Sequence, residues 1–319
     1  MWLVVVASGS QGDTAVLRRV ADIPLSGPAV RFDYQSIDTS ASRLYFSHMN
    51  AGELLVFDLT DRKIVGAVAD LPRVTGVCCV PALHKVYASV PGHHHVAVID
   101  ARTLSVVARV GDIGFPDGIA YAPGERKLYV SDESGGGELV IDGPSNRVVT
   151  TIPLGGEAGN TLYDPGTRHI LVAVQTHNEV VEIDPKQDRV VARHGLPRAA
   201  HPHGMSLDDA SRLLFVANEG NATLQTVDLR AWKVIDRQAV GEDPDVLAFD
   251  PGWRRLYVAA ETGPVTLFTL AGRKLRMDGH ATLPHGHTVS VDPRTHLAYF
   301  PLQNVDGHPL LRIMAAREP

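Results

Sequence analysis

Short runs of alternating apolar and polar residues recur along the whole chain. Residues 118–154 show the pattern, in which GIAYA, KLYVSD, ELVID and RVVTTIPL follow one another and are separated by residues such as Gly, Pro, Asp and Ser. Alternation with a period of two, together with β-branched and aromatic side chains, is typical of β-strands. No stretch has a clear helical period, so the pattern predicts an all-β protein built from units of four short strands.

The four-strand unit recurs seven times. One position, which is Asp in five of the seven copies, lies at 38, 80, 122, 164, 208, 250 and 292, so the copies are 42 residues apart except for one interval of 44. Seven residues later each copy has a large apolar residue: Tyr45, Tyr87, Tyr129, Leu171, Phe215, Tyr257 and Tyr299. A four-stranded unit with this period is typical of a propeller blade. The sequence therefore predicts a single domain over residues 1–319, a seven-bladed β-propeller.

The last copy lacks a fourth strand. HTVSVD, HLAYFPL and HPLLRIMA supply three strands, while VLRRVADIPL near the N-terminus is similar to the fourth strand of the third copy, RVVTTIPL. An open sheet edge invites aggregation, so we expect residues 16–25 to complete blade 7. Residues 1–15 are then an extension or the remnant of a leader, because MWLVVVASGS has no basic residues before its apolar run and is not a complete signal peptide.

Three repeat segments carry a family resemblance. LYVSDE, LFVANEG and LYVAAE, each followed by a further strand, are similar to the repeats of the YVTN family of β-propellers, which includes the YncE-like proteins. The resemblance covers nearly the whole chain and implies the seven-bladed fold. It also favours a periplasmic or secreted location, because family members include exported bacterial proteins, and related seven-bladed propellers include lactonases. We expect a monomer.

Composition narrows the classes of partner. The chain has a net charge of −6, with 30 basic and 36 acidic residues and no block of like charge. A broad basic surface for nucleic acid is therefore not expected. No apolar run approaches the roughly 18 residues of a membrane span. A small molecule, or a protein partner on one face of the ring, is the expected ligand.

Two columns of the repeat are expected at the mouth of the central channel, because the first strand of each blade lines that channel. Residues five before the Asp position are Asp33, Thr75, Asp117, Gly159, His203, Asp245 and His287. Residues seven before it are Arg31, Arg73, Phe115, Glu157, His201, Asp243 and His285. Positions two apart on a strand point to the same side. We therefore expect both columns to face the channel together.

Imidazoles and carboxylates that converge from neighbouring strands suit a divalent metal ion. His203, Asp245 and His287 lie on three consecutive blades and are the predicted ligands of one ion, Zn, Fe, Mn or Cu. The second column adds alternative ligands or partners that orient the first set: His201, Asp243 and His285. The other interpretation is a polar channel in which these groups pair with each other and with water.

Glutamates from the same mouth are candidate general bases. Glu133, Glu219 and Glu261 lie four residues after the aromatic position, and Glu157 lies in the second column. A metal beside them would polarise a carbonyl or activate water, which fits lactone hydrolysis, or lyase or isomerase chemistry. Two alternatives remain open: a non-catalytic propeller that binds a ligand or a protein, and a metal carrier or sensor.

Arginines on blades 1 and 2 predict an anionic substrate. Arg31 and Arg73 offer forked donors that suit a carboxylate; in the alternative, Arg31 pairs with Asp33 and Arg73 faces solvent. FPDGIAY and GEAGN are also similar to metal-site segments of the gluconolactonase and regucalcin family. That resemblance implies a place for Asp117 and Asn160 beside the ligand, although Asp-Gly also simply favours a turn.

Overall fold

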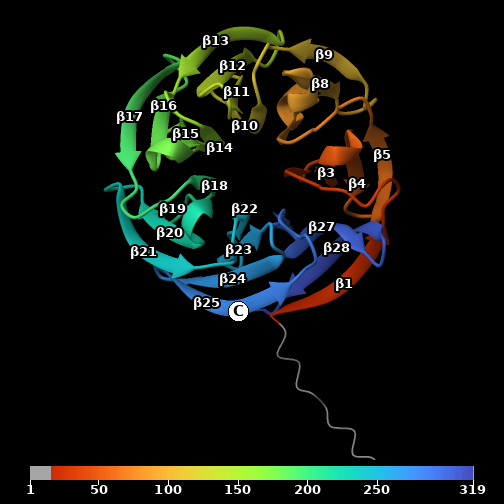
Figure 1. The fold of residues 1–319 in the computed structure, drawn as a ribbon. Coiled ribbons are helices and arrows are strands. Elements are labelled where there is room, and N and C mark those ends of the chain that lie inside the picture. The colour runs from red at the N-terminus through yellow and green to blue at the C-terminus, as the bar shows by residue number, and fades with distance from the viewer. Residues whose placement is uncertain (1–15, 319) are drawn as a thin grey trace, which may run out of the picture.

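Seven four-stranded antiparallel sheets form a closed ring around a central channel in the computed structural model (Figure 1). The structure describes residues 16–318, so the predicted extension over residues 1–15 lies outside the described residues. The described residues contain strands, turns and five single-turn 3-10 helices, and no helix among them has the length and apolar character needed to cross a bilayer. The prediction of an all-β, seven-bladed propeller is confirmed.

Each blade runs from an inner strand at the channel to an outer strand at the rim. Blade 1 has β2 (Gln35–Asp38), β3 (Arg43–His48), β4 (Glu53–Asp58) and β5 (Lys63–Val68). Blade 2 has β6 (Val77–Val80), β7 (Lys85–Val90), β8 (His95–Asp100) and β9 (Val106–Val110). Blade 3 has β10 (Pro116–Ala122), β11 (Lys127–Asp132), β12 (Gly137–Asp142) and β13 (Arg147–Pro153). Blade 4 has β14 (Ala158–Asp164), β15 (His169–Val174), β16 (Glu179–Asp184) and β17 (Arg189–Gly195).

The later blades continue the order. Blade 5 has β18 (Pro202–Asp208), β19 (Leu213–Asn218), β20 (Thr223–Asp228) and β21 (Lys233–Ala239). Blade 6 has β22 (Pro244–Asp250), β23 (Arg255–Ala260), β24 (Pro264–Ala271) and β25 (Lys274–Thr282). Blade 7 has β26 (Ser290–Asp292), β27 (Leu297–Val305), β28 (His308–Ala316) and β1 (Leu17–Pro24). The 3-10 helices are η1 (Met49–Ala51), η2 (Pro81–Leu83), η3 (Pro91–His93), η4 (Gln175–His177) and η5 (Glu219–Asn221).

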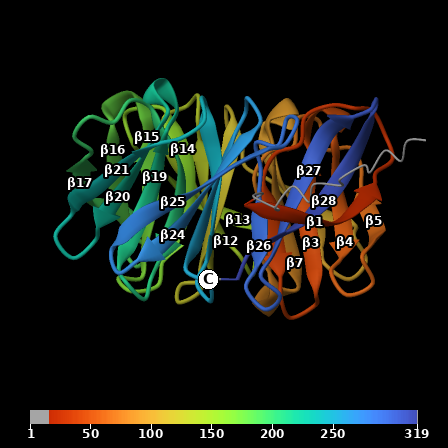
Figure 2. The same cartoon turned by 90° about the horizontal axis from the view of Figure 1, so that it is seen from below.

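The N-terminal strand closes the ring. β1 pairs antiparallel with β28, from Leu17 opposite Ala316 to Pro24 opposite Leu310. Seen from the side, the molecule is a short disc with β1 at the rim of blade 7 (Figure 2). The expectation that residues 16–25 complete blade 7 is confirmed, and the backbone groups of β28 that would otherwise form an open edge are paired.

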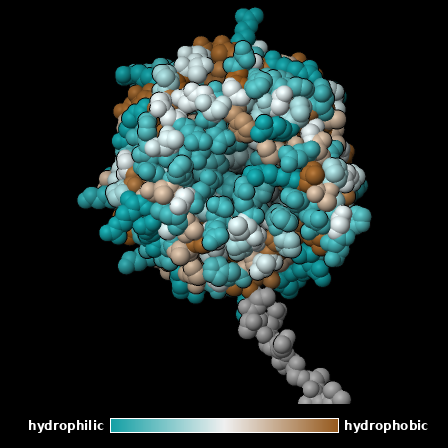
Figure 3. All heavy atoms as spheres, viewed as in Figure 1, coloured by the Kyte–Doolittle hydropathy of each residue, from teal (hydrophilic) through white to brown (hydrophobic). Residues whose placement is uncertain are grey.

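The apolar core lies between neighbouring sheets rather than within one sheet. Tyr87 and Val98 of blade 2, for example, share a buried cluster with Leu128 and Ile141 of blade 3. Tyr87 also joins blades 2 and 3 through its hydroxyl group, since Tyr87 Oη donates to the carbonyl of Gly143 at 2.9 Å. Polar residues dominate the face of the ring that Figure 3 shows.

Glycines bring the inner strands of neighbouring blades close together. A Cβ at Gly204 would lie 1.7 Å from the carbonyl oxygen of Asp245, and one at Gly76 would lie 1.9 Å from that of Asp117. Because a side chain has no room there, the Gly that follows His203 allows blade 5 to approach blade 6 directly beside the channel mouth. Gly159 has a similar effect, since a Cβ there would lie 3.0 Å from Cδ2 of His203.

Candidate metal centre at the channel mouth

A small polar cavity opens at the end of the channel where the inner strands begin, with a volume of about 190 Å³. Arg31 and His203 line it together with six carboxylates from four blades: Asp33, Asp117, Glu133, Glu219, Asp245 and Glu261. The first predicted column therefore lies at the channel mouth, and its Asp and His side chains are buried.

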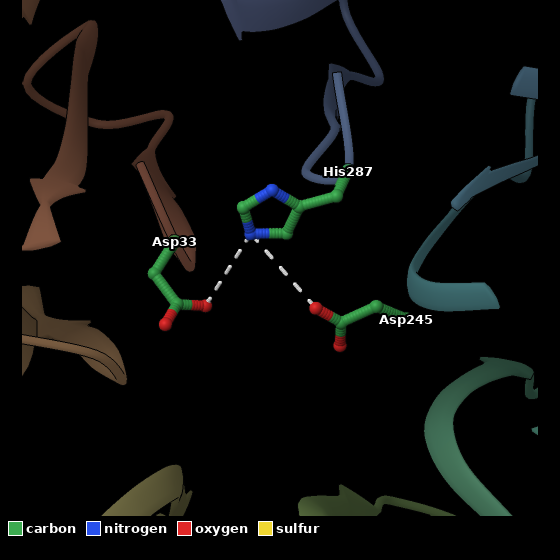
Figure 4. Close-up of side chains that lie close together, drawn as sticks. All are labelled: Asp33, Asp245 and His287. Carbon is green, nitrogen blue, oxygen red and sulfur yellow. Dashed lines mark ion pairs between the residues drawn. The ribbon is translucent and has the colours of Figure 1, made fainter. Parts of the chain in front are cut away.

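Asp245 on β22 is the centre of the cluster. Its Oδ1 lies 3.2 Å from Nδ1 of His203, and its Oδ2 lies 3.9 Å from Nε2 of His287. Asp33 Oδ1 approaches the same His287 nitrogen at 3.9 Å (Figure 4). Glu219 Oε1 lies 3.4 Å from His203 Nδ1. The donor atoms form two groups, Asp33–Asp245–His287 and His203–Glu219–Asp245, each with all atoms within 4.8 Å of one another.

Three of these ligand atoms are buried without a hydrogen-bond partner among the described residues: His203 Nδ1, Asp245 Oδ1 and His287 Nε2. Buried polar atoms almost always have a partner, and each exception calls for an explanation. An imidazole nitrogen and a carboxylate oxygen are both ligands for a transition metal. The residues present therefore fit a metal ion.

The crowded carboxylates alter each other's ionisation. Burial and the nearby Asp33 carboxylate raise the pKa of Asp117 to about 8. Burial also raises the pKa of Glu219 to about 7, against the opposing effect of His203. Around His203 burial disfavours the charged ring, but Asp245 and Glu219 outweigh burial and raise its pKa well above the usual range. The cluster thus retains protons near neutral pH, and a bound cation would take their place.

Arg31 enters this cavity and Arg73 does not line it. Arg31 Nη1 lies 2.7 Å from Glu261 Oε1, and its Nη2 lies 3.8 Å from Asp245 Oδ2. Arg73 is exposed, with its guanidinium 5.0 Å from the centre of the Phe115 ring. Arg31 is therefore the arginine that lies beside the candidate metal ligands. It pairs with Glu261 and Asp245, and not with Asp33 alone.

Three members of the second predicted column, the candidate metal ligands, do not face the channel with the first column. His201, Asp243 and His285 are exposed and have φ of 51°, 52° and 52°. This left-handed conformation turns the chain just before the inner strand, so the two-residue period of a strand does not extend to them. The carbonyls of His201 and Asp243 instead accept hydrogen bonds from the N–H groups of Glu219 and Glu261, at 3.0 and 2.9 Å. These residues hold the glutamates over the cavity through their backbone.

Two further predicted residues lie away from the cluster. Glu157 is half-buried and is not part of the cavity lining, while Asn160 lines a deeper part of the channel with a volume of about 340 Å³. The sequence reasoning also missed Tyr34, whose hydroxyl donates to Asp117 Oδ2 at 3.0 Å across the channel. Tyr34 directly follows Asp33, at a position where blades 2, 3 and 5 have Gly. A large side chain in place of Gly is the signal in the sequence that could have singled out Tyr34.

Comparison with known proteins establishes the fold alone. No protein-family model and no curated protein sequence matches this chain. Among solved structures, the chain is similar to hydrazine synthase of Kuenenia stuttgartiensis, with a TM-score of 0.77 and 15% sequence identity over 94% of this chain and 97% of that chain. At this low identity the similarity supports one conclusion, that the chain is a seven-bladed β-propeller.

Proposed function

We propose that the protein binds a divalent transition metal at the channel mouth and catalyses hydrolysis of a small lactone there. The observation that carries this proposal is a set of buried donor atoms on His203, Asp245 and His287 that lack hydrogen-bond partners within residues 16–318. Mixed nitrogen and oxygen donors favour Zn, Fe or Mn over the oxygen-only coordination that Ca and Mg prefer. A bound ion would supply Lewis-acid chemistry, in which a carbonyl is polarised or water is made a better nucleophile.

The chain's own residues would supply orientation and proton transfer. Burial raises the pKa of Glu133, so this carboxyl can accept a proton from water closer to neutral pH than an exposed glutamate can. Arg31, one third exposed beside Glu261, would hold the carboxylate that forms when the ring opens. Hydrolysis adds one water across the ring C–O bond. The hydroxyl group goes to the carbonyl carbon and the proton to the leaving oxygen.

The YVTN-type segments support the same proposal. LYVSDE, LFVANEG and LYVAAE are similar to the repeats of YncE-like propellers, and lactonases occur among related seven-bladed proteins. We assign the chain to this group as part of the proposal. The excess of carboxylates in the cavity adds a physical requirement, because an anionic product would be repelled unless a cation first compensates the negative charge.

The test begins with elemental analysis of purified protein, before and after dialysis against Zn, Mn or Fe. We expect bound metal in the wild type and in a His201→Ala/His285→Ala control, whose substituted side chains are exposed. A His203→Ala/His287→Ala variant should lose it. The metal-loaded protein is then assayed with aliphatic and sugar lactones, with and without a chelator. Metal binding with no turnover of any lactone would support a carrier or sensor instead, and a wild type that takes up no metal would end the proposal.

A further inference from the structure

The two oxygens of the Asp245 carboxylate face different histidines. Oδ1 lies 3.2 Å from Nδ1 of His203, whereas Oδ2 lies 3.9 Å from Nε2 of His287. Both nitrogens and Oδ1 are buried and lack hydrogen-bond partners among the residues that the structure describes. The Oδ1–Nδ1 contact is thus short without being a hydrogen bond. A metal ion that accepts electron pairs from both atoms would give each of them a partner.

Each side of Asp245 has its own second carboxylate. On one side, Glu219 Oε1 lies 3.4 Å from the His203 nitrogen. On the other side, Asp33 Oδ1 lies 3.9 Å from the His287 nitrogen (Figure 4). The histidines do not fall into one common group of close donor atoms, and Asp245 is the residue that the two groups share. The single ion expected from the sequence would therefore leave one complete set of donors unused.

We propose that the channel mouth holds two divalent metal ions bridged by the carboxylate of Asp245. One ion is bound by His287 and Asp33 with Oδ2 of Asp245, and the other by His203 and Glu219 with Oδ1. This inference rests on the metal site proposed above and adds the number of ions that the site holds. In two-metal sites of enzymes the ions lie about 3.5–4 Å apart and act together on the attacking and leaving oxygens of a displacement.

The charge of the cavity supports two ions rather than one. Six carboxylates line it, and Arg31 compensates one of them. A second divalent ion would raise the compensated negative charges from three to five. When all six are ionised, two divalent ions and Arg31 leave one negative charge uncompensated, whereas one divalent ion and Arg31 leave three. Glu133 belongs to neither donor group and stays available for proton transfer.

The test counts metal ions per chain after dialysis against Zn²⁺ or Mn²⁺ and gel filtration. The wild type should retain two ions. Glu219→Gln and Asp33→Asn each remove one carboxylate without changing the shape of the side chain, and each variant should retain one ion. The exposed His201→Ala substitution is the control and should retain two. Electron paramagnetic resonance of the Mn²⁺-loaded wild type should show a spin-coupled pair, which becomes an isolated Mn²⁺ signal in Glu219→Gln.

The outcomes separate the two proposals. One ion per wild-type chain, with an uncoupled Mn²⁺ signal, overturns the bridged pair and leaves the single-metal function standing. No bound ion in the wild type overturns both. Two ions retained by both Glu219→Gln and Asp33→Asn would also overturn the assignment of ligands. Because the count and the spin coupling are measured on the wild type itself, a variant that fails to fold does not remove the test.

Discussion

Arg312 on β28 binds both carboxylate oxygens of Asp22 on β1, donating from Nε at 2.8 Å and from Nη2 at 2.7 Å. The two residues are 290 positions apart in the sequence and directly opposite each other in the sheet. Their side chains are largely buried, with exposed fractions of 15% and 25%. A forked, charge-assisted pair of this kind is among the stronger hydrogen-bonded contacts in proteins. The pair joins β1, the N-terminal strand at the outer edge of blade 7, to the neighbouring strand β28.

Removal of residues 1–25 should therefore open the ring. β28 would keep β27 but lose its other partner strand, β1, and would present free N–H and C=O groups at that edge, so we expect aggregation and a lower melting temperature. Size-exclusion chromatography with light scattering and thermal unfolding measure both effects. Removal of residues 1–15 alone is the control, because β1 begins at Leu17 and remains whole. A monomeric 26–319 protein with unchanged melting would contradict the role of β1.

Gly204→Ala should destabilise the protein, because the new Cβ would lie 1.7 Å from the carbonyl oxygen of Asp245. We expect a loss of about 3 kcal/mol in the free energy of unfolding, together with weaker metal binding as blades 5 and 6 move apart. Gly195→Ala is the matched control, since apart from its chain neighbours no residue in the described part of the chain lies within 4 Å of the position that its new methyl group would take. Denaturant titration of the two variants measures the difference. Equal stability of both would contradict the close approach of the inner strands.

Glu138 should make the protein less stable as the pH rises. Its side chain is fully buried, Thr161 donates to Oε1 at 3.0 Å, and burial raises the pKa of the carboxyl well above its usual range. Above the unfolded-state pKa of about 4.3 the unfolded chain releases a proton that the folded chain keeps. Stability therefore falls with pH by up to about 1.4 kcal/mol per unit, until the folded-state pKa is passed.

Glu138→Gln should remove this dependence. The free energy of unfolding of the variant, relative to that of the wild type, should increase from pH 5 to pH 8. Urea unfolding at several pH values measures this difference. Glu318→Gln, at an exposed position, is the control and should follow the wild-type curve. If the difference between Glu138→Gln and the wild type is constant across this range, the buried carboxyl does not titrate as the structure implies.

Arg31→Ala should weaken the binding of an anion and leave metal binding intact. With metal-loaded protein and 4-hydroxybutyrate as the probe, we expect binding to be weaker by about 2–5 kcal/mol, since a charged contact in a largely desolvated cavity is lost. Metal affinity should not fall, because Arg31 repels cations and its removal frees Asp245 and Glu261. Arg73→Ala is the control and should bind the anion like the wild type, because Arg73 is exposed and its guanidinium lies over the Phe115 ring. Equal binding by both variants and the wild type, measured by calorimetry, would exclude Arg31 as the anion site.

The repeat made most of the architecture predictable. Alternation of apolar residues and the aromatic position at Tyr45 and its equivalents are local properties, and each blade repeats them at a spacing of 42 or 44 residues. Equivalent positions in a closed ring must lie at equivalent depths in the channel. For this reason the column that contains His203, Asp245 and His287 could be placed at the channel mouth from the sequence alone.

Only the tertiary structure decided how the residues before that column are directed and which of the donor side chains lie close together. The positive φ of His201, Asp243 and His285 has no reliable signal in the residue types, because left-handed backbone is unusual outside Gly and Asn. The contacts of Asp245 with both histidines depend on the curvature of the ring and on the close approach of neighbouring strands. These are distances between blades, and a one-dimensional repeat specifies the order of the blades but not those distances.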